Sequence, residues 1–284
     1  HSQGELTYED EQGQVQRGIG YASMAGSLRL DGGLTSLTDA LAAHLTSVTL
    51  NISVSAIEKE ENGLTVTYRN DQGSGTIRAD HVVLALPPRI AAQSIDFTPQ
   101  LPAASLSRME AIPTWMAGQA KAIAVYETPF WRHQGLSGDA MSRRGPMVEI
   151  HDASPDGPRE TQSGGLFGFI GVPPQHRIDA ARLRQATLEQ LVRLFGPKAG
   201  EPLELVIKDW ATDPLTATPH DQTPVHHHPE YGLPAEMTGL MGGRLLFGST
   251  EIAAQFGGYL EGALEASDNV LATLQRQEFR REAG

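Results

Sequence analysis

The chain has 284 residues, of which 39% are hydrophobic and 20% charged, so it can bury a sizeable core as one large or two modest domains. A net charge of −12 argues against a general nucleic-acid binder, whereas an acidic surface can attract cations such as amines, although most acidic proteins are merely soluble. The sequence has no Cys, which excludes disulfides and thiolate ligands, and no apolar run of the ~20 residues that span a bilayer. The absence of Cys suits the cytoplasm and the periplasm alike, and we assign the protein to the cytoplasm.

The N-terminal region changes character near residue 31. Residues 1–26 are polar and Gly-rich, which predicts an extended or partly ordered lead-in. After a turn at Gly32-Gly33, leucines recur at helical spacing, with Asp31 near the helix start. These leucines are Leu34, Leu37, Leu41 and Leu45.

A β-rich stretch follows. Residues 50–57 alternate as a strand, although Ile57 is one step out of phase, and 64–68 return after a turn. A third strand begins near Ile77 and leads into the nearly continuous apolar run 80–86, which is typical of a sheet buried on both faces. We expect Pro87-Pro88 to end it, and 91–112 to connect two domains.

The second half mixes strands with two helices. Strands are predicted over 122–126, 165–170, 203–210 and 244–248. A helix spans 183–195 and stops at Gly196-Pro197, and a closing helix covers about 260–274. Residues 211–235 are predicted to be a long loop and 275–284 a frayed tail. The sequence therefore predicts a mixed α/β fold.

Eight short motifs follow one another in a specific order along residues 28–274. They are Arg29–Gly33, Val54–Ile57, Ala79–Pro88, Phe97–Pro102, Lys121–Arg132, Lys208–Trp210, Phe247–Glu251 and Gly257–Ala263. In order and spacing they resemble the flavin monoamine oxidases and relatives with a glutathione-reductase-like FAD domain. The resemblance implies that 27–90 and 236–275 belong to a partial FAD-binding domain and 91–235 to a substrate-binding domain with a mixed sheet and flanking helices. Residues 1–26 would then be a lead-in and 276–284 a tail.

The resemblance also implies roles for individual residues near the flavin. Lys121 falls where the family holds a water near flavin N5, and Tyr259 where it has one wall of an aromatic cage. Trp210 matches a tryptophan beside the flavin ring. Each has a structural alternative: a solvent-facing strand lysine for Lys121, and core packing for the two aromatic residues.

At the second cage position the sequence departs from the family pattern. Thr218-Pro219-His220 stands where a tyrosine is expected, so His220 is the implied substrate contact and a strict monoamine-oxidase cage is in doubt. Non-covalent FAD is implied to contact Gly32, Gly33, Val54, Thr250, Glu251 and Gly258. An ordinary strand valine explains Val54 equally well.

The dinucleotide-binding fingerprint Gly-x-Gly-x-x-Gly is missing from the N-terminal part of the sequence. The Gly-rich run 164–171 has the wrong spacing and is followed by Pro173-Pro174, so a packed strand is the better interpretation. We therefore expect a fragment or truncated form, whose binding of FAD is the central unknown. The apolar edges left by missing strands favour a complementary N-terminal chain or a homo-oligomer.

Other clusters carry weaker indications. His220 with His226–His228 invites a metal site, but consecutive histidines cannot all face one ion, so a solvated loop is expected and no metal is predicted. Glu149 and His151-Asp152 could line a pocket or lie on the surface.

Three functional hypotheses follow. The first is FAD-dependent oxidation of an amine, possibly an amino acid, by the intact enzyme: hydride passes to flavin N5, the imine hydrolyses and dioxygen becomes hydrogen peroxide. The second is a catalytically inactive fragment that binds a partner or itself. The third is a sister flavoenzyme such as a desaturase, which the altered cage allows. Whether this chain alone is an enzyme is left open.

Overall fold

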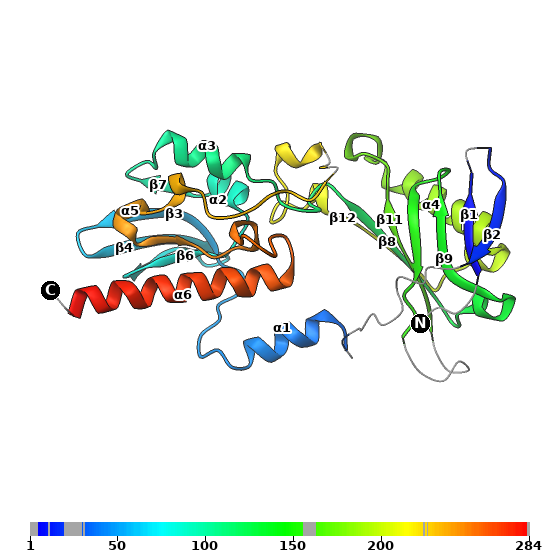
Figure 1. The fold of residues 1–284 in the computed structure, drawn as a ribbon, viewed down its shortest axis with the longest axis horizontal. Coiled ribbons are helices and arrows are strands. Elements are labelled where there is room, and N and C mark those ends of the chain that lie inside the picture. The colour runs from blue at the N-terminus through cyan, green and yellow to red at the C-terminus, as the bar shows by residue number, and fades with distance from the viewer. Residues whose placement is uncertain are drawn as a thin grey trace. The chain divides into compact units, whose positions relative to one another are not determined.

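The structure, a computed structural model, describes residues 5–10, 12–19, 30, 32–155, 163–223, 225 and 227–282 (Figure 1). The chain divides into two compact units. The first contains residues 1–44 and 118–212, and the second contains 45–117 and 213–284. Residues 91–117 and 213–235, which the sequence grouped with the substrate domain, thus pack with the second unit; which unit takes which ligand stays a prediction. No helix in the described part of the chain has the length and apolarity to cross a membrane.

A seven-stranded sheet organises the first unit, in the order β12-β8-β11-β10-β9-β1-β2. Only the β1–β9 pair is parallel. The strands are β1 (Glu5–Glu9), β2 (Val15–Ile19), β8 (Ala120–Tyr126), β9 (Leu136–Ser142), β10 (Met147–Asp152), β11 (Gly164–Ile170) and β12 (Glu204–Asp209).

Helix α4 (Ala180–Phe195) covers one face of this sheet, as Figure 1 shows. Because side chains alternate along a strand, Ala120, Ala122 and Ala124 all enter the same core, where they pack with apolar residues of α4 such as Leu191. Asp179 caps the helix by accepting a hydrogen bond from the Arg182 amide, and Gly196 ends it. The strands predicted at 122–126, 165–170 and 203–210 and the helix at 183–195 are therefore confirmed.

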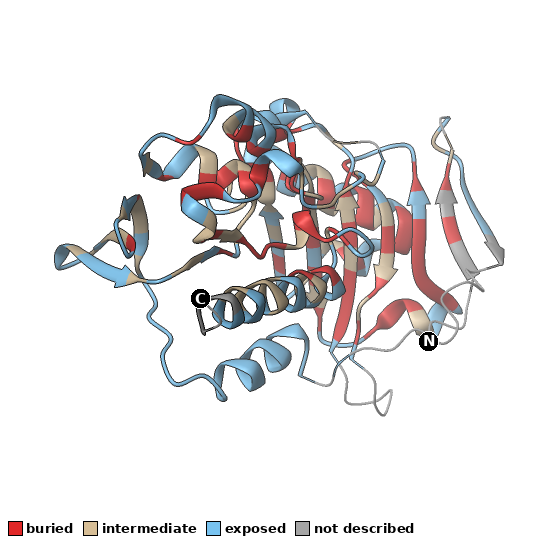
Figure 2. Cartoon of the chain, turned by 60° about the vertical axis from the view of Figure 1, so that its left-hand side comes forward, coloured by how far each residue is buried: buried red, intermediate tan, exposed pale blue. Residues whose placement is uncertain are grey.

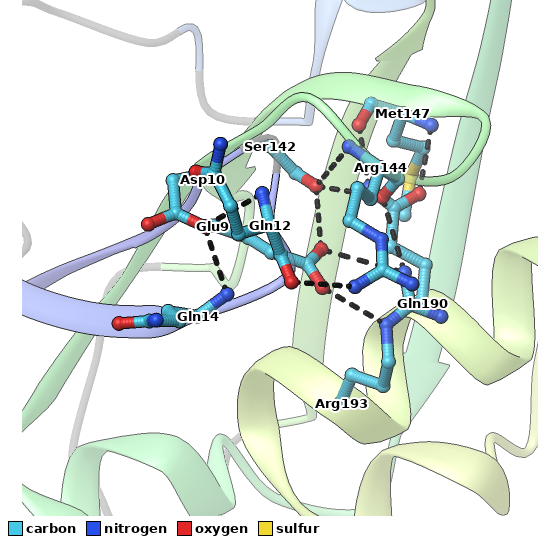
Figure 3. A network of polar contacts seen from close by, with 9 residues as sticks. All are labelled: Glu9, Asp10, Gln12, Gln14, Ser142, Arg144, Met147, Gln190 and Arg193. Atoms are coloured by element: carbon cyan, nitrogen blue, oxygen red, sulfur yellow. Dashed lines mark hydrogen bonds and ion pairs between the residues drawn. The ribbon is translucent and has the colours of Figure 1, made fainter.

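The predicted lead-in contributes strands β1 and β2 to this sheet. Glu9 has a fully buried carboxylate, which accepts hydrogen bonds from the Ser142 hydroxyl at 2.8 Å and from Arg193 Nε at 3.1 Å (Figure 3). Burial raises the pKa of Glu9, but those two hydrogen bonds and the charges of Arg193 and Arg144 outweigh it, so the pKa lies below its ordinary value. A polar anchor thus attaches β1 to the sheet, which hydrophobic periodicity cannot reveal.

We expect Glu9→Gln to lower the free energy of unfolding by about 1–2 kcal/mol at neutral pH. The expected loss is this small because Arg193 is partly exposed, so that solvent screens its charge. A carboxyl whose folded pKa is depressed stabilises the fold above its unfolded pKa, and this stabilisation is lost as pH falls through the folded pKa. The difference between the free energies of unfolding of wild type and variant, measured with urea, should therefore shrink below about pH 4. Exposed Glu58→Gln is the control, and a pH-independent difference would contradict the role of Glu9.

The second unit contains a four-stranded sheet, β5-β4-β3-β7, and a two-stranded parallel sheet, β13-β6. A register shift between Val54 and Ala56 explains why Ile57 is out of phase with the residues before it. The strands are β3 (Ser53–Glu60), β4 (Gly63–Asn70), β5 (Gly73–Ala79), β6 (Val82–Leu84), β7 (Asp96–Thr98) and β13 (Leu245–Phe247).

The second unit differs from three expectations. The stretch 91–112 is not a plain connection, because α2 (Pro88–Ser94), β7 and α3 (Ala103–Ala111) form there and bury Met109. The predicted tail is helical, since α6 (Leu260–Glu282) continues to Glu282. The apolar run 80–86 yields only the short β6, in which Val83 remains 40% exposed, so it is not buried on both faces.

The remaining helices are short. Helix α1 (Leu34–Ala42) forms as predicted, begins after Gly33 and exposes all its residues (Figure 2); Asp31 lies outside the described residues. Helix α5 (Leu240–Gly243) is a kinked turn. The 3-10 helices are η2 (Phe130–Gln134), η3 (Pro174–His176), η4 (Pro197–Gly200), η5 (Trp210–Thr212), η6 (Pro219–Gln222), η7 (Ala235–Met237) and η8 (Thr250–Ile252).

Candidate functional site

Lys121 lies on the face of the seven-stranded sheet opposite the core. Its neighbours Ala120 and Ala122 point into the core, and Lys121 is half-buried. Its Nζ lies 5.1 Å from the centroid of the Phe169 ring and 5.8 Å from that of Phe167, both on β11. Lys121 is thus packed against two aromatic rings, in contrast to the solvent-facing alternative.

Trp210 follows directly on the end of β12. Its backbone N–H donates to the Gln119 carbonyl at 3.0 Å, and its ring lies 4.6 Å from Lys208 Nζ. Because Trp210 is only half-buried, it is not a core tryptophan of the first unit. Lys208 on β12 is the direct cross-strand partner of Lys121 on β8. Trp210 therefore lies two residues beyond the residue that pairs with Lys121.

A buried ion pair fixes the strand end that carries Trp210. Arg177, whose side chain is 1% exposed, donates to both carboxylate oxygens of Asp209 at 2.7 and 2.6 Å. It also donates to the Val172 and Gly118 carbonyls. This bidentate ion pair anchors Asp209, the last residue of β12, immediately before Trp210.

A carboxylate–histidine–carboxylate cluster occupies the Lys121 face two strands away. His151 Nδ1 lies 3.2 Å from Asp139 Oδ1, and its Nε2 lies 2.8 Å from Glu149 Oε1. The hydrogen bond to Asp139 raises the pKa of His151 and burial opposes it, but the Glu149 contact and both carboxylate charges leave the pKa above its ordinary value. The His151 ring stacks on Phe167, with centroids 6.4 Å apart.

Asp152, the neighbour of His151, points elsewhere. It is buried and accepts hydrogen bonds from Trp131 Nε1 at 2.9 Å and from Arg132 Nε at 2.8 Å. Of the residues that could line a pocket, Glu149 and His151 therefore meet on the open face, whereas Asp152 stabilises the core.

In the second unit, aromatic rings surround His228. The Tyr259 ring stacks on it with centroids 5.1 Å apart and planes 5° apart, while Trp115 lies 4.8 Å and Tyr231 5.7 Å away. His228 Nε2 is buried and has no hydrogen-bond partner in the described part of the chain. The expected solvated loop is therefore wrong at His228, which is half-buried among rings.

His220 takes no part in this cluster. It is exposed on η6, and the ring facing Tyr259 is that of His228. His226 lies outside the described residues, and the described ones contain no group of three or more His, Asp or Glu side chains that could hold a metal ion. A role of His220 in binding substrate stays a prediction, and the folded path of this proline-rich loop has no periodicity from which it could be read.

The segment 249–258 contacts the same group of rings. Thr250 donates from Oγ1 to the Tyr259 carbonyl at 2.7 Å. Gly258 has φ of 80°, and a Cβ there would lie 3.1 Å from Trp115 Cβ and 3.2 Å from His228 Nε2. Glycine at this position therefore permits the ring packing. The packing of the rings explains the glycine without a bound cofactor.

Glu251 is the most unusual charged residue of the second unit. It is 4% exposed, and its Oε2 atom has no hydrogen-bond partner among the residues described. Burial raises the pKa of Glu251 above its ordinary value, and a hydrogen bond from its own backbone opposes that rise. A buried acceptor without a partner is costly, which is typical of a group that meets a polar ligand.

The other predicted cofactor residues belong to different units. Gly32 and Gly33, with φ of 78° and 76°, precede α1 in the first unit, while the half-buried Val54 lies in β3 of the second and pairs with Tyr68. A pocket of 460 Å³ also opens beside β13 and α6, lined by apolar residues such as Leu245 and Val270. It includes none of the predicted site residues.

Comparison with known proteins decides the family. Residues 5–270 match the family described as flavin containing amine oxidoreductase. The chain belongs to this family. It is 33% identical to a Mycobacterium tuberculosis protein described as flavin-containing monoamine oxidase AofH, over 86% of this chain and 51% of that protein. Putrescine oxidase of Kocuria rosea is 31% identical over 66% of this chain and 41% of its own length.

Solved structures of flavin amine oxidoreductases agree with the fold. A triple mutant of putrescine oxidase superimposes with a TM-score of 0.68 at 26% identity, covering 87% of this chain and 53% of that one. Cyclohexylamine oxidase from Brevibacterium oxydans gives a TM-score of 0.57 at 26% identity, covering 80% and 48%. The mixed α/β fold is therefore confirmed, and the chain spans about half the length of these relatives.

Proposed function

We propose that this chain is the substrate-side part of an FAD-dependent oxidase of amines. The observation that carries the proposal is Lys121, held against Phe167 and Phe169 on an open sheet face in a chain of the amine oxidoreductase family. The first unit would bind the substrate, and the second, with parts of 27–90 and 236–275, would bind FAD in a glutathione-reductase-like manner.

Bound FAD would accept a hydride from the carbon that carries the amine nitrogen and pass electrons to dioxygen, giving hydrogen peroxide. Lys121 would hold a water near flavin N5 by donating hydrogen bonds from its ammonium group. Trp210 in the first unit and Tyr259 in the second would each contact the flavin or the amine, and the ring that stacks on Tyr259 is that of His228. The imine leaves to be hydrolysed by water.

The described residues fit FAD at Glu251. Its partnerless buried oxygen can accept a hydrogen bond from a ribityl hydroxyl, which would remove the cost of leaving that acceptor unpaired. Thr250 at the start of η8 and the backbone of Val54 are further proposed contacts, and Gly32, Gly33 and Gly258 are proposed cofactor-binding residues as well. The link is non-covalent at least with respect to cysteine, since the sequence has none.

A second candidate is a catalytically inactive module that binds a partner chain or a second copy. Its support is the two-stranded parallel sheet β13-β6, because parallel sheets are normally larger and covered on both faces, and Val83 is 40% exposed. A complementary chain carrying further strands is the proposed partner.

A cytoplasmic location stays a prediction.

The visible absorbance spectrum, recorded before and after addition of FAD and gel filtration, tests the proposal together with a peroxide assay on a panel of amines. We expect a retained flavin spectrum and peroxide from at least one amine. Glu251→Gln should weaken FAD binding about tenfold, because it alters one buried hydrogen bond, while exposed Glu261→Gln should not. A chain that retains no flavin, or retains it and oxidises no amine, would favour the inactive module.

A further inference from the structure

We propose that Tyr231 is a positioning residue, which holds His228 and Tyr259 in their stacked arrangement and thereby determines how tightly the amine is bound. The part of this inference that concerns the amine rests on the proposed function, because it takes Tyr259 as a contact of the substrate. The part that concerns the stack of rings does not. All the residues that carry the inference belong to the second unit.

Tyr231 connects the loop that carries His228 to the segment that follows α3. Its hydroxyl donates a hydrogen bond to the Pro113 carbonyl at 2.9 Å. Its ring meets the His228 ring edge to face, with centroids 5.7 Å apart and planes 85° apart. Trp115, two residues beyond Pro113, contacts the same imidazole. The hydroxyl of Tyr231 therefore sets the distance between the loop and the segment on which Trp115 lies.

The Tyr231 ring also lies directly against Gly257, two residues before Tyr259. A Cβ at Gly257 would lie 2.2 Å from Cδ2 of Tyr231 and 2.7 Å from its Cγ, far inside the ordinary contact distance of two carbon atoms. The backbone that leads to Tyr259 and the loop that carries His228 thus have Tyr231 as a common contact. A shift of this ring would move the two stacked rings relative to each other.

The hydroxyl of Tyr231 keeps its proton at the pH of an enzyme assay. Burial raises the pKa of Tyr231 well above its ordinary value, and the negative charge of Glu251 adds to the rise. Only the protonated phenol can donate to a carbonyl. The hydrogen bond to Pro113 is therefore a permanent contact, and its effect should not vary between about pH 6 and pH 9.

A second attachment holds the same loop on the other side of His228. Arg89 on α2 donates from Nε to the Glu110 carbonyl at 2.7 Å and from Nη1 to Asp221 at 2.5 Å. Both side chains are buried or nearly so, with 12% and 2% exposed. The loop is thus attached near the end of α3 at both sides of His228, and Tyr231 is the nearer attachment.

Tyr259 is the member of the stack that a ligand can reach. It is 57% exposed, whereas His228 is half-buried among the rings. Stacking on His228 fixes the orientation of the Tyr259 ring and leaves part of its surface open. Because aromatic rings attract cations and apolar groups mainly over their faces, the orientation of this ring would determine its contact with an amine.

Nuclear magnetic resonance of the full chain with isotope-labelled histidine tests the stack. The ring protons of His228, assigned with His228→Gln, should be shifted upfield by the Tyr259 ring, and Tyr259→Leu should abolish this shift. We expect Tyr231→Phe to remove part of the shift and Tyr231→Leu most of it. Tyr68→Phe removes a hydroxyl from a half-buried tyrosine on β4 of the same unit and should leave the signal in place.

Peroxide formation from benzylamine, measured with added FAD, tests the part that concerns the amine. Tyr231→Phe should raise KM about 3- to 10-fold, the factor that corresponds to one hydrogen bond, and leave kcat nearly unchanged because only binding is affected. The ratio of the KM values should be constant over the pH range given above. A purely structural role would leave KM unchanged, since phenylalanine fills the same space in the core.

The outcomes separate this inference from the proposed function. A His228 signal that is unchanged in both Tyr231 variants would overturn the role of Tyr231. A changed signal with an unchanged KM would remove the effect on the amine and leave the oxidase intact. A changed signal in a protein that forms no peroxide would support the role of Tyr231 in the stack and count against the oxidase. Far-UV circular dichroism of each variant checks that it is folded.

Discussion

Arg177→Ala is expected to lower the free energy of unfolding by about 3–5 kcal/mol, because it leaves the Asp209 carboxylate, which is 19% exposed, without its bidentate partner. The variant also removes the donors to the Val172 and Gly118 carbonyls, which face the same guanidinium. Urea unfolding at neutral pH measures the loss, with an unchanged slope indicating that only stability has changed.

Two further variants test whether the loss of stability comes from the broken ion pair. Arg182→Ala, an exposed change on α4, should stay within about 0.5 kcal/mol of wild type. Combining Arg177→Met with Asp209→Asn should recover part of the loss, since replacing both partners of a buried pair costs less than leaving one charge alone. A single variant as stable as wild type would show that the ion pair does not hold the end of β12.

The second large effect concerns catalysis. In the FAD-loaded protein, Lys121→Met should slow turnover of an amine substrate by about 10²- to 10³-fold, because methionine fills the space over Phe167 and Phe169 but cannot donate hydrogen bonds to a water. Stopped-flow absorbance of the flavin, first without oxygen and then with it, tells whether amine oxidation or reaction with dioxygen is slowed.

Lys198→Met, at an exposed position on η4, is the matched control and should keep wild-type rates. Wild-type rates for both half-reactions of Lys121→Met would remove Lys121 from the proposed mechanism. A lower unfolding midpoint with normal rates would instead give Lys121 the purely structural role of a lysine packed on two rings.

The sequence predicted elements whose own residues carry a strong pattern. Strands β8 and β11 are short apolar runs, and α4 has apolar residues at helical spacing between an acidic cap and Gly196, so each could be located without knowledge of its neighbours. The order of the motifs from Arg29 to Ala263 likewise predicted the family, which the comparisons confirmed. The roles of the individual site residues stay proposals.

Strands β1, β9 and β10 could not be located in this way. The sequence of β9, Leu136–Ser142, offers no alternation, and β1 is attached to the sheet through the buried Glu9 carboxylate and its partners on β9 and α4. These partners are more than 130 residues away along the chain. Only the folded chain brings them together.

What the sequence determined by itself about this protein is therefore local: the periodic helices and apolar strands, the mixed α/β class, and the motifs that place the chain among the amine oxidoreductases. Tertiary structure alone decided that His228 rather than His220 faces Tyr259, and that His151 lies between Glu149 and Asp139. The physical reason is that strand register and loop path depend on contacts between distant residues, whose energies no local pattern contains.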